Sequence, residues 1–179
     1  MKYRNLIITG MLLALGVILS RIVHLIPLPL PAYAFSPLHL PVFICAAICG
    51  WKYGLACGVL LPFLSYFVSG KPLLYPSAIA MAAEMAAYAL VTAAIIDIKI
   101  FKIDITVKTF IAVLIAQIAG RIIGGAVTAA LLGAKGETYL FKTFVVSYFL
   151  NTLPAIILQL VIIPPIAKSV DYFRLKGAA

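Results

Sequence analysis

Charged residues are scarce in this chain of 179 residues, and acidic residues are the scarcest. Only 11% of the residues are charged, and five aspartates and glutamates stand against 14 lysines and arginines. An ordinary soluble domain has roughly 25% charged residues, and a chain of this size leaves much of its surface exposed to solvent. The composition therefore excludes a water-soluble enzyme. With hydrophobic residues at 65%, it also excludes a disordered chain.

Motifs of catalysis, nucleotide binding and metal binding are also missing. Gly70-Lys71 is followed by Pro72, and the Gly-Ala-Lys-Gly stretch at 133–136 does not complete a Walker A spacing. HExxH, Asp-rich and GxSxG patterns do not occur. The three cysteines lie inside apolar stretches without CxxC or Cys/His zinc spacing, which is typical of small buried residues: Cys45, Cys49 and Cys57. We therefore expect no catalytic residue, no metal site and no cofactor.

Long apolar runs are abundant instead, and the mean hydropathy is +1.17. A membrane-crossing helix needs about 20 mostly apolar residues, with about 17 as the lower limit. The runs predict an all-α membrane protein, a single domain over residues 1–179 with six spans near 5–26, 37–50, 54–69, 77–97, 108–132 and 144–167. We expect Gly50-Trp51-Lys52-Tyr53-Gly54 to form a tight turn between the two short spans. Pro62 and Pro154 are expected to bend or loosen their spans.

Lysines and arginines in the connecting segments predict the orientation of the chain, because cytoplasmic loops carry an excess of them. With the N-terminus inside, nine basic residues fall in cytoplasmic segments: Lys2, Arg4, Lys52, Lys99, Lys102, Lys108, Lys168, Arg174 and Lys176. Three fall in the outside loops 27–36, 70–76 and 133–143: Lys71, Lys135 and Lys142. This bias predicts that both termini are cytoplasmic, and it explains the net charge of +9 without a nucleic-acid partner.

A cleaved signal peptide is the alternative for the N-terminus. Lys2 and Arg4, an apolar run and then Ala32-Tyr33-Ala34 follow the order of a signal peptide and its cleavage site. Arg21 and His24 interrupt the approach to that site, and the apolar run is long. We therefore expect this run to remain as the first span. Because no soluble domain follows any span, we expect the function to lie within the membrane or at its faces.

Polar side chains inside the spans are few and are the candidates for a functional site, since an ionisable group at mid-span costs roughly 2.5–3.5 kcal/mol. They are Arg21, His24, His39, Glu84, Gln117, Arg121, Asn151 and Gln159. Glu84 lies seven residues from the outer start of its span, about 10 Å deep, and Asn151 lies at the same depth in the last span. Most of these groups therefore lie in the outer half. This arrangement indicates a pocket loaded from outside rather than a pore, which needs polar lining to both surfaces.

Helical spacing places these side chains on particular faces. Glu84 and Tyr88 are four residues apart and share a face, as do Gln117 and Arg121 with Gly125. Beside the Arg121 stripe runs a ridge of small residues suited to close helix packing: Ala116, Gly120, Gly124 and Thr128. We expect the fifth span to pack with this ridge and to present Arg121 with the neighbouring stripe.

Each polar residue also has a purely structural explanation. Glu84 and Arg121 could form a buried ion pair, and Asn151 could make a hydrogen bond between helices. His39 could cap a helix or face the lipid headgroups, and Arg21 could extend its side chain to the outer headgroups. The depth that these groups share favours the pocket.

Four stretches carry a family resemblance: Phe35-Ser36-Pro37-Leu38-His39-Leu40-Pro41-Val42, Gly50-Trp51-Lys52-Tyr53-Gly54, Gly70-Lys71-Pro72-Leu73-Leu74-Tyr75-Pro76 and Ala80-Met81-Ala82-Ala83-Glu84. Together with the length and the six expected spans, they resemble the substrate-binding S components of energy-coupling factor (ECF) vitamin transporters. The series is most similar to the branch assigned to pyridoxine or hydroxymethylpyrimidine. The resemblance extends over nearly the whole chain.

The resemblance implies a mechanism shared between subunits. Such a protein, in a bacterial plasma membrane, captures a water-soluble vitamin from outside with the outer ends of its helices and their loops. It then docks on a transmembrane scaffold subunit that carries two ATPase subunits, reorients in the bilayer and releases the vitamin inside. The missing Walker A motif agrees with this mechanism, because the partner chains use the ATP.

The first helix of many S components carries an Ala-xxx-Ala pair that contacts the scaffold, and this chain departs from that pattern. The nearest match is Gly10-xxx-Ala14, with Gly16-xxx-Ser20 as a second candidate on another face. Gly10 and Ala14 share a helical face with Arg21, so that face can serve docking and binding only at different depths. We therefore favour Gly10 and Ala14 for docking and give less weight to Arg21 as a ligand residue.

The candidate vitamin-binding residues are His39, Tyr75, Glu84, Tyr88, Arg121 and Asn151. Tyr75, in the loop between the third and fourth spans, is expected to close over the ligand. A paired Glu84 and Arg121 would leave the pocket nearly neutral and would favour pyridoxine or hydroxymethylpyrimidine. An inward-facing Arg21 would favour a carboxylate such as pantothenate, because a guanidinium group binds a carboxylate through two hydrogen bonds. A stand-alone membrane carrier of a small molecule is the alternative from another class.

Overall fold

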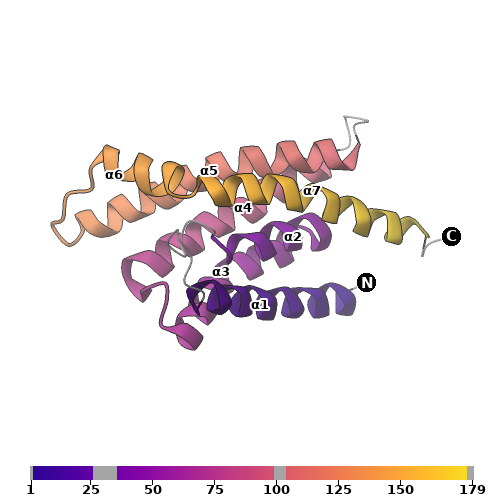
Figure 1. Cartoon of the computed structure of the whole chain (residues 1–179), viewed down its shortest axis with the longest axis horizontal. Coiled ribbons are helices and arrows are strands. Elements are labelled where there is room, and N and C mark those ends of the chain that lie inside the picture. The colour runs from indigo at the N-terminus through magenta and orange to yellow at the C-terminus, as the bar shows by residue number, and fades with distance from the viewer. Residues whose placement is uncertain (1, 26–35, 99–103, 177–179) are drawn as a thin grey trace.

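The computed structural model describes residues 2–25, 36–98 and 104–176 of the chain (Figure 1). Every regular element in these ranges is helical, which confirms the expected all-α class. The elements are α1 (Lys2–Leu25), α2 (His39–Cys49), α3 (Trp51–Ser69), η2 (Leu74–Ala78), α4 (Ile79–Asp97), α5 (Ile105–Gly133), α6 (Phe141–Val145), η3 (Val146–Leu150) and α7 (Leu153–Lys176). The element η3 is π-helical, whereas η2 contains a kink at Tyr75, whose φ of −123° and ψ of 134° are not helical. The start of α1 and the end of α7 lie at one end of the bundle, and the connection from α5 to α6 lies at the other (Figure 1).

Five helical segments are long and apolar enough to cross a membrane: Tyr3–Val23, Trp51–Ser69, Leu74–Asp97, Ile105–Gly133 and Phe141–Val170. They confirm a chain with several membrane-spanning helices. The expected second span differs, because its helix α2 has only 11 residues. At a rise of about 1.5 Å per residue, α2 is roughly 16 Å long, whereas the hydrocarbon core is roughly 30 Å thick. Thus α2 is too short to cross the membrane by itself.

The short helix α2 lies inside the bundle, in contact with α1, α3, α4 and α7. Most of its side chains are buried. Val42, Phe43 and Cys45 are completely enclosed and belong to the hydrophobic core. In a bilayer, the free backbone groups at the ends of a short helix need protein or water around them. The surrounding helices provide that cover, which explains how so short a helix persists here.

Gly50 alone forms the turn between α2 and α3, so the expectation of a turn over residues 50–54 is wrong. Its φ of 86° lies in the region that glycine adopts without steric cost, and its N–H donates to the carbonyl oxygen of Ala46 at 3.2 Å. Helix α3 then begins at Trp51. Gly54 lets the two helices pack immediately after the turn, since a Cβ atom there would lie 2.8 Å from the Cα of Ala46.

Both prolines that were expected to bend or loosen their spans lie within helices. Helix α3 continues through Pro62 from Trp51 to Ser69. Pro154 lies in the first turn of α7, where the missing N–H removes no hydrogen bond of the helix. The last apolar segment is instead interrupted just before Pro154, between η3 and α7. The two prolines inside α7 are Pro164 and Pro165.

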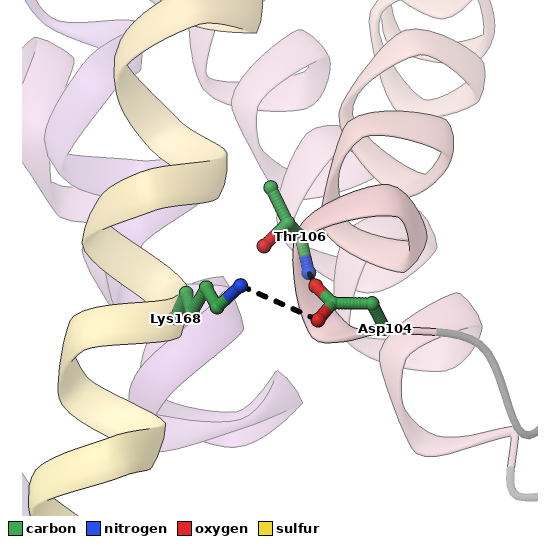
Figure 2. A network of polar contacts seen from close by, with 3 residues as sticks. All are labelled: Asp104, Thr106 and Lys168. Carbon is green, nitrogen blue, oxygen red and sulfur yellow. Dashed lines mark hydrogen bonds and ion pairs between the residues drawn. The ribbon is translucent and has the colours of Figure 1, made fainter.

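A polar contact joins α5 to α7 at the start of α5. Figure 2 shows Asp104 at the N-cap of α5, facing Lys168 of α7. The Thr106 N–H donates to one carboxylate oxygen at 2.7 Å, and the Lys168 Nζ lies 3.4 Å from the other. Hydrogen bonding from Thr106 holds the pKa of Asp104 below its usual range. Because both charged side chains are exposed, the ion pair itself adds little stability, and the main role of Asp104 is to cap the helix.

Small residues let the helices approach each other closely. A Cβ atom at Gly58 of α3 would lie 2.8 Å from the carbonyl oxygen of Met85 in α4. Gly120 of α5 packs in the same way against the ring of Tyr88 in α4, which confirms that the small ridge of the fifth span serves packing. Gly10 of α1 is different, because a Cβ atom there would meet nothing within 4 Å.

The contrast between Gly58 and Gly10 predicts opposite effects of the same substitution. Gly58→Ala should lower the free energy of unfolding by about 1–3 kcal/mol, because the new methyl group would press on the backbone of α4. Gly10→Ala should leave it unchanged or raise it by up to about 1 kcal/mol, since alanine is the better helix former. Thermal unfolding of both variants in detergent micelles measures the difference. Equal stability of the two variants would contradict the close α3–α4 packing.

Candidate functional site

A cavity of about 550 Å³ lies where α2 and α4 begin and where α5 meets the last segment. This end of the bundle is opposite the end that holds the two chain termini (Figure 1). Its apolar lining is Pro37, Leu38, Pro72, Pro76, Ala80 and Met81. Its polar lining is Ser20, Ser36, His39, Lys71, Ser77, Glu84, Arg121, Thr128, Tyr139, Ser147, Tyr148, Asn151 and Thr152. The size falls in the range of sites for small organic molecules, roughly 300–1,000 Å³.

Four of the six candidate binding residues meet in this cavity: His39, Glu84, Arg121 and Asn151. They come from α2, α4, α5 and the break before α7, so the shared depth estimated from the sequence corresponds to a shared place in the fold. The remaining two, Tyr75 and Tyr88, do not belong to the lining.

His39 lines the cavity with a side chain that is almost completely buried. The side chain is 4% exposed, and neither ring nitrogen has a hydrogen-bond partner in the described part of the chain. The imidazole packs edge-on against Tyr88, with ring centroids 5.2 Å apart. Burial excludes the alternative in which His39 faces the headgroups. A buried nitrogen without a partner is costly, and a bound ligand in the cavity could supply that partner.

Glu84 and Tyr88 act as a pair, as their spacing predicts. The Tyr88 hydroxyl donates a hydrogen bond to Oε1 of Glu84. The Tyr88 ring is completely buried and stacks on Phe43 with a centroid distance of 4.8 Å. Tyr88 does not line the cavity, so its ring makes no contact there. Its hydroxyl orients the Glu84 carboxylate from within the core. We expected Tyr88 to contact the vitamin directly, whereas the structure places it where it supports Glu84.

Arg121 is occupied by protein groups and makes no ion pair with Glu84, although both side chains are described. Its Nη1 donates to the carbonyl oxygen of Tyr148 and to the Thr152 hydroxyl. Its Nη2 donates to the Gln117 side chain at 3.3 Å. The direct Glu84–Arg121 ion pair, which the sequence left open as an alternative, is therefore not formed, because Arg121 donates to Tyr148, Thr152 and Gln117 instead.

Tyr75 joins two parts of the chain at the edge of the cavity. Its hydroxyl donates to the carbonyl oxygen of Leu131 near the end of α5, and the Nζ of Lys135 lies 4.3 Å from the centre of its ring. Its neighbours Pro72 and Pro76 line the cavity, whereas Tyr75 does not. Tyr75 therefore ties the segment before α4 to α5 and does not cover the cavity itself.

Several lining residues escaped the sequence analysis. Lys71 and Tyr139 lie in connecting segments, where hydropathy gives no signal. Tyr148 and Thr152 lie at the break around η3, where the chain leaves the regular helical period. Partial burial raises the pKa of Tyr139 above its usual range. A period of 3.6 residues cannot assign faces across such a break, so only the folded chain identifies these residues.

The two small-residue pairs of α1 have different surroundings. Gly16 packs against Leu61, because a Cβ atom added at Gly16 would lie 2.9 Å from the leucine side chain. The Ser20 hydroxyl lies 3.3 Å from the Ser65 hydroxyl. Gly10 and Ala14 are instead exposed on the outer face of α1. Arg21 is also exposed and does not line the cavity. The side chain of His24 and the Ala32-Tyr33-Ala34 stretch lie outside the described residues.

Comparison with known proteins gives one match. Residues 4–167 of the chain match the family described as ECF transporter, substrate-specific component. Neither the curated proteins nor the solved structures contain a match to this chain. The family match covers nearly the whole sequence and includes at least part of every long helix, and it confirms the resemblance to S components. The branch for pyridoxine or hydroxymethylpyrimidine remains a prediction. The chain belongs to the family of substrate-specific components of ECF transporters.

Proposed function

We propose that this protein is the high-affinity substrate-binding subunit of an ECF-type ABC transporter, capturing a water-soluble vitamin from outside for ATP-driven uptake. The observation that carries the proposal is a cavity of about 550 Å³ inside an apolar helical bundle, with polar side chains such as His39, Glu84 and Asn151 in its lining. The family accounts for its partners, an ECF scaffold subunit and ATPase subunits. Most lining residues lie toward one end of the bundle, which suits capture rather than conduction.

The orientation follows from the basic residues. Cytoplasmic segments are expected to carry the excess of lysine and arginine, and that rule assigns both termini to the cytoplasm. The lining comes largely from the starts of α2 and α4 and from the segment before α7, and these parts lie away from the end of the bundle that holds the termini (Figure 1). In a bacterial plasma membrane the cavity would then open to the outside, where the vitamin is captured.

The lining supports a small ring with hydroxyl groups, and we favour pyridoxine or hydroxymethylpyrimidine. His39 offers two nitrogens without partners, and Asn151 and Glu84 add an amide and a carboxylate. Arg21, whose inward position would have favoured a carboxylate, is exposed and outside the lining. Lys71 is the cationic side chain that a carboxylate ligand such as pantothenate would use instead. Pantothenate or another vitamin is therefore the alternative within the class.

The outer face of α1 is the surface proposed for docking on the scaffold. Gly10 and Ala14 are exposed there, and an added Cβ at Gly10 would meet no atom of the chain within 4 Å. Small residues on an exposed helix face let a second helix approach closely. Gly16 and Ser20 are already used for packing inside the bundle, which favours the first pair.

Transport by the isolated chain separates this function from the alternative of a stand-alone carrier. We expect the purified chain to bind its vitamin tightly but to accumulate none when reconstituted alone in vesicles. Uptake should require the scaffold and ATPase subunits together with ATP, because this chain has no nucleotide-binding motif. Radiolabelled vitamin uptake into vesicles with and without the partner subunits is the measurement. Ion-driven accumulation by the chain alone would establish the carrier function instead.

Competition binding tests the charge of the ligand. Glu84→Gln should weaken pyridoxine or hydroxymethylpyrimidine binding by roughly tenfold to a hundredfold, because a hydrogen bond to a charged acceptor is lost. Lys71→Gln should change it little, and Arg21→Gln, at an exposed position, serves as the matched control. Isothermal titration with pyridoxine, hydroxymethylpyrimidine and pantothenate measures each affinity. Tight pantothenate binding that only Lys71→Gln abolishes would refute the neutral-ring assignment.

Bulky substitutions on α1 test the docking surface. Gly10→Leu and Ala14→Leu should reduce uptake by the whole transporter by roughly tenfold, corresponding to about 1.4 kcal/mol of lost docking energy. Vitamin binding by the isolated chain should remain, since neither position lines the cavity. Met11→Leu, at an exposed neighbouring position, is the control and should keep full uptake. Loss of binding together with uptake would mean that these positions serve the fold instead.

A further inference from the structure

The last apolar segment is interrupted beside the cavity. Residues 146–152, which we name the cavity wall, comprise the π-helical element η3 and the two residues before α7. Four residues of the cavity wall line the cavity: Ser147, Tyr148, Asn151 and Thr152. A departure from the α-helical pattern leaves backbone groups without regular partners, and a membrane environment makes such groups costly. The position of the cavity wall therefore depends on contacts from elsewhere in the fold.

One face of α5 supplies those contacts. Arg121, Gly124, Gly125 and Thr128 are spaced i, i+3, i+4 and i+7, which places them on one side of the helix. Aromatic rings pack against the two glycines. A Cβ atom added at Gly124 would lie 3.1 Å from the Tyr148 ring, and one added at Gly125 would collide with the Phe144 ring. The Thr128 hydroxyl lies 2.8 Å from that of Tyr148. This face therefore holds the cavity wall by both shape and hydrogen bonding.

Arg121 makes the central contact of this face. Its Nη1 donates to the Tyr148 carbonyl oxygen and to the Thr152 hydroxyl, so one guanidinium nitrogen binds both sides of the interruption. Thr152 in turn donates to the same Tyr148 carbonyl at 2.7 Å. The arginine is 1% exposed, and the Phe149 ring centre lies 5.8 Å from its Cζ. The planar, fixed geometry of a guanidinium group suits such multiple contacts better than a single ammonium does.

We propose that Arg121 is a positioning residue, which holds the cavity wall against α5 and so sets the shape of the binding cavity for any ligand. Its two Nη nitrogens donate to the protein rather than point unused into the cavity. The consequence for binding rests on the function proposed above, but the consequence for the wall does not. Loss of Arg121 should loosen residues 146–152 first and should weaken all ligands alike.

Hydrogen exchange of the intact chain tests the effect on the wall without any ligand. In detergent micelles, Arg121→Gln should speed amide exchange in the peptide over residues 146–153 by roughly tenfold, corresponding to about 1.4 kcal/mol of local stability. Exchange over α3 should stay as in the wild type. Arg121→Lys should restore part of the protection, because it keeps the charge and loses the planar geometry. Arg21→Gln, which removes an exposed arginine, is the matched control and should change neither peptide.

Binding of two chemically different probes tests the effect on the cavity. Pyridoxine and pantothenate should lose affinity by similar factors in Arg121→Gln, because a displaced wall changes the cavity for both. A residue that binds a carboxylate directly would instead affect pantothenate alone. Selective loss of pantothenate with unchanged exchange in the 146–153 peptide would overturn the proposal. Equal acceleration of exchange in every helix would overturn it too, because the role would then be global stability.

Thr128→Val keeps the proposal testable if Arg121→Gln does not fold. This substitution removes the hydroxyl next to Tyr148 and leaves the shape of the side chain nearly unchanged. It should speed exchange in the same peptide, by less than the arginine variant, and leave α3 unaffected. Unchanged exchange in the cavity wall would overturn the role of this face of α5. If the wild-type chain bound no vitamin at all, the proposed function would fail, while the exchange experiments would still decide the role of Arg121.

Discussion

A membrane interior offers no water to backbone amide and carbonyl groups, so each of them needs a partner within the protein. Continuous helices without an internal proline, such as α4 and α5, satisfy this requirement along their length. The short helix α2 satisfies it only because α1, α3, α4 and α7 surround it. At the interruption before α7, a side chain supplies a partner for the backbone, since Arg121 donates to the carbonyl oxygen of Tyr148. The rest of the architecture follows from where such departures from the helix are allowed.

These departures lie next to the cavity. The start of α2, the element η2 before α4 and the element η3 before α7 each contribute lining residues or adjoin them. An interrupted helix brings backbone polarity and room for polar side chains to a place that would otherwise be filled by apolar ones. The family of the chain requires a site for a small solute inside an apolar protein. Irregular segments backed by regular helices form the cavity that we propose as this site.

Local geometry explains which parts of the candidate site could be predicted. The Glu84–Tyr88 pair lies within one helix turn, so a spacing of four residues was sufficient to predict it. The Glu84–Arg121 pair needed two helices to meet at a particular rotation, and the backbone at Tyr148 proved the nearer partner for Arg121. Lys71 lies in a connecting segment, and Tyr148 lies in a π-helical one. Neither position follows a period that a sequence pattern can detect.

The sequence by itself determined the solvent and the class of fold. Apolar runs of about 20 residues with few charges indicate membrane-spanning helices, because a helix satisfies its backbone groups within one segment. It also indicated the depth of His39, Glu84 and Asn151, since depth depends only on counting residues along a helix. Tertiary structure alone decided which side chains face one another, that Gly50 reverses the chain in one residue, and that α2 stays short inside the bundle. Those outcomes depend on contacts between segments far apart in the chain, and no local pattern records them.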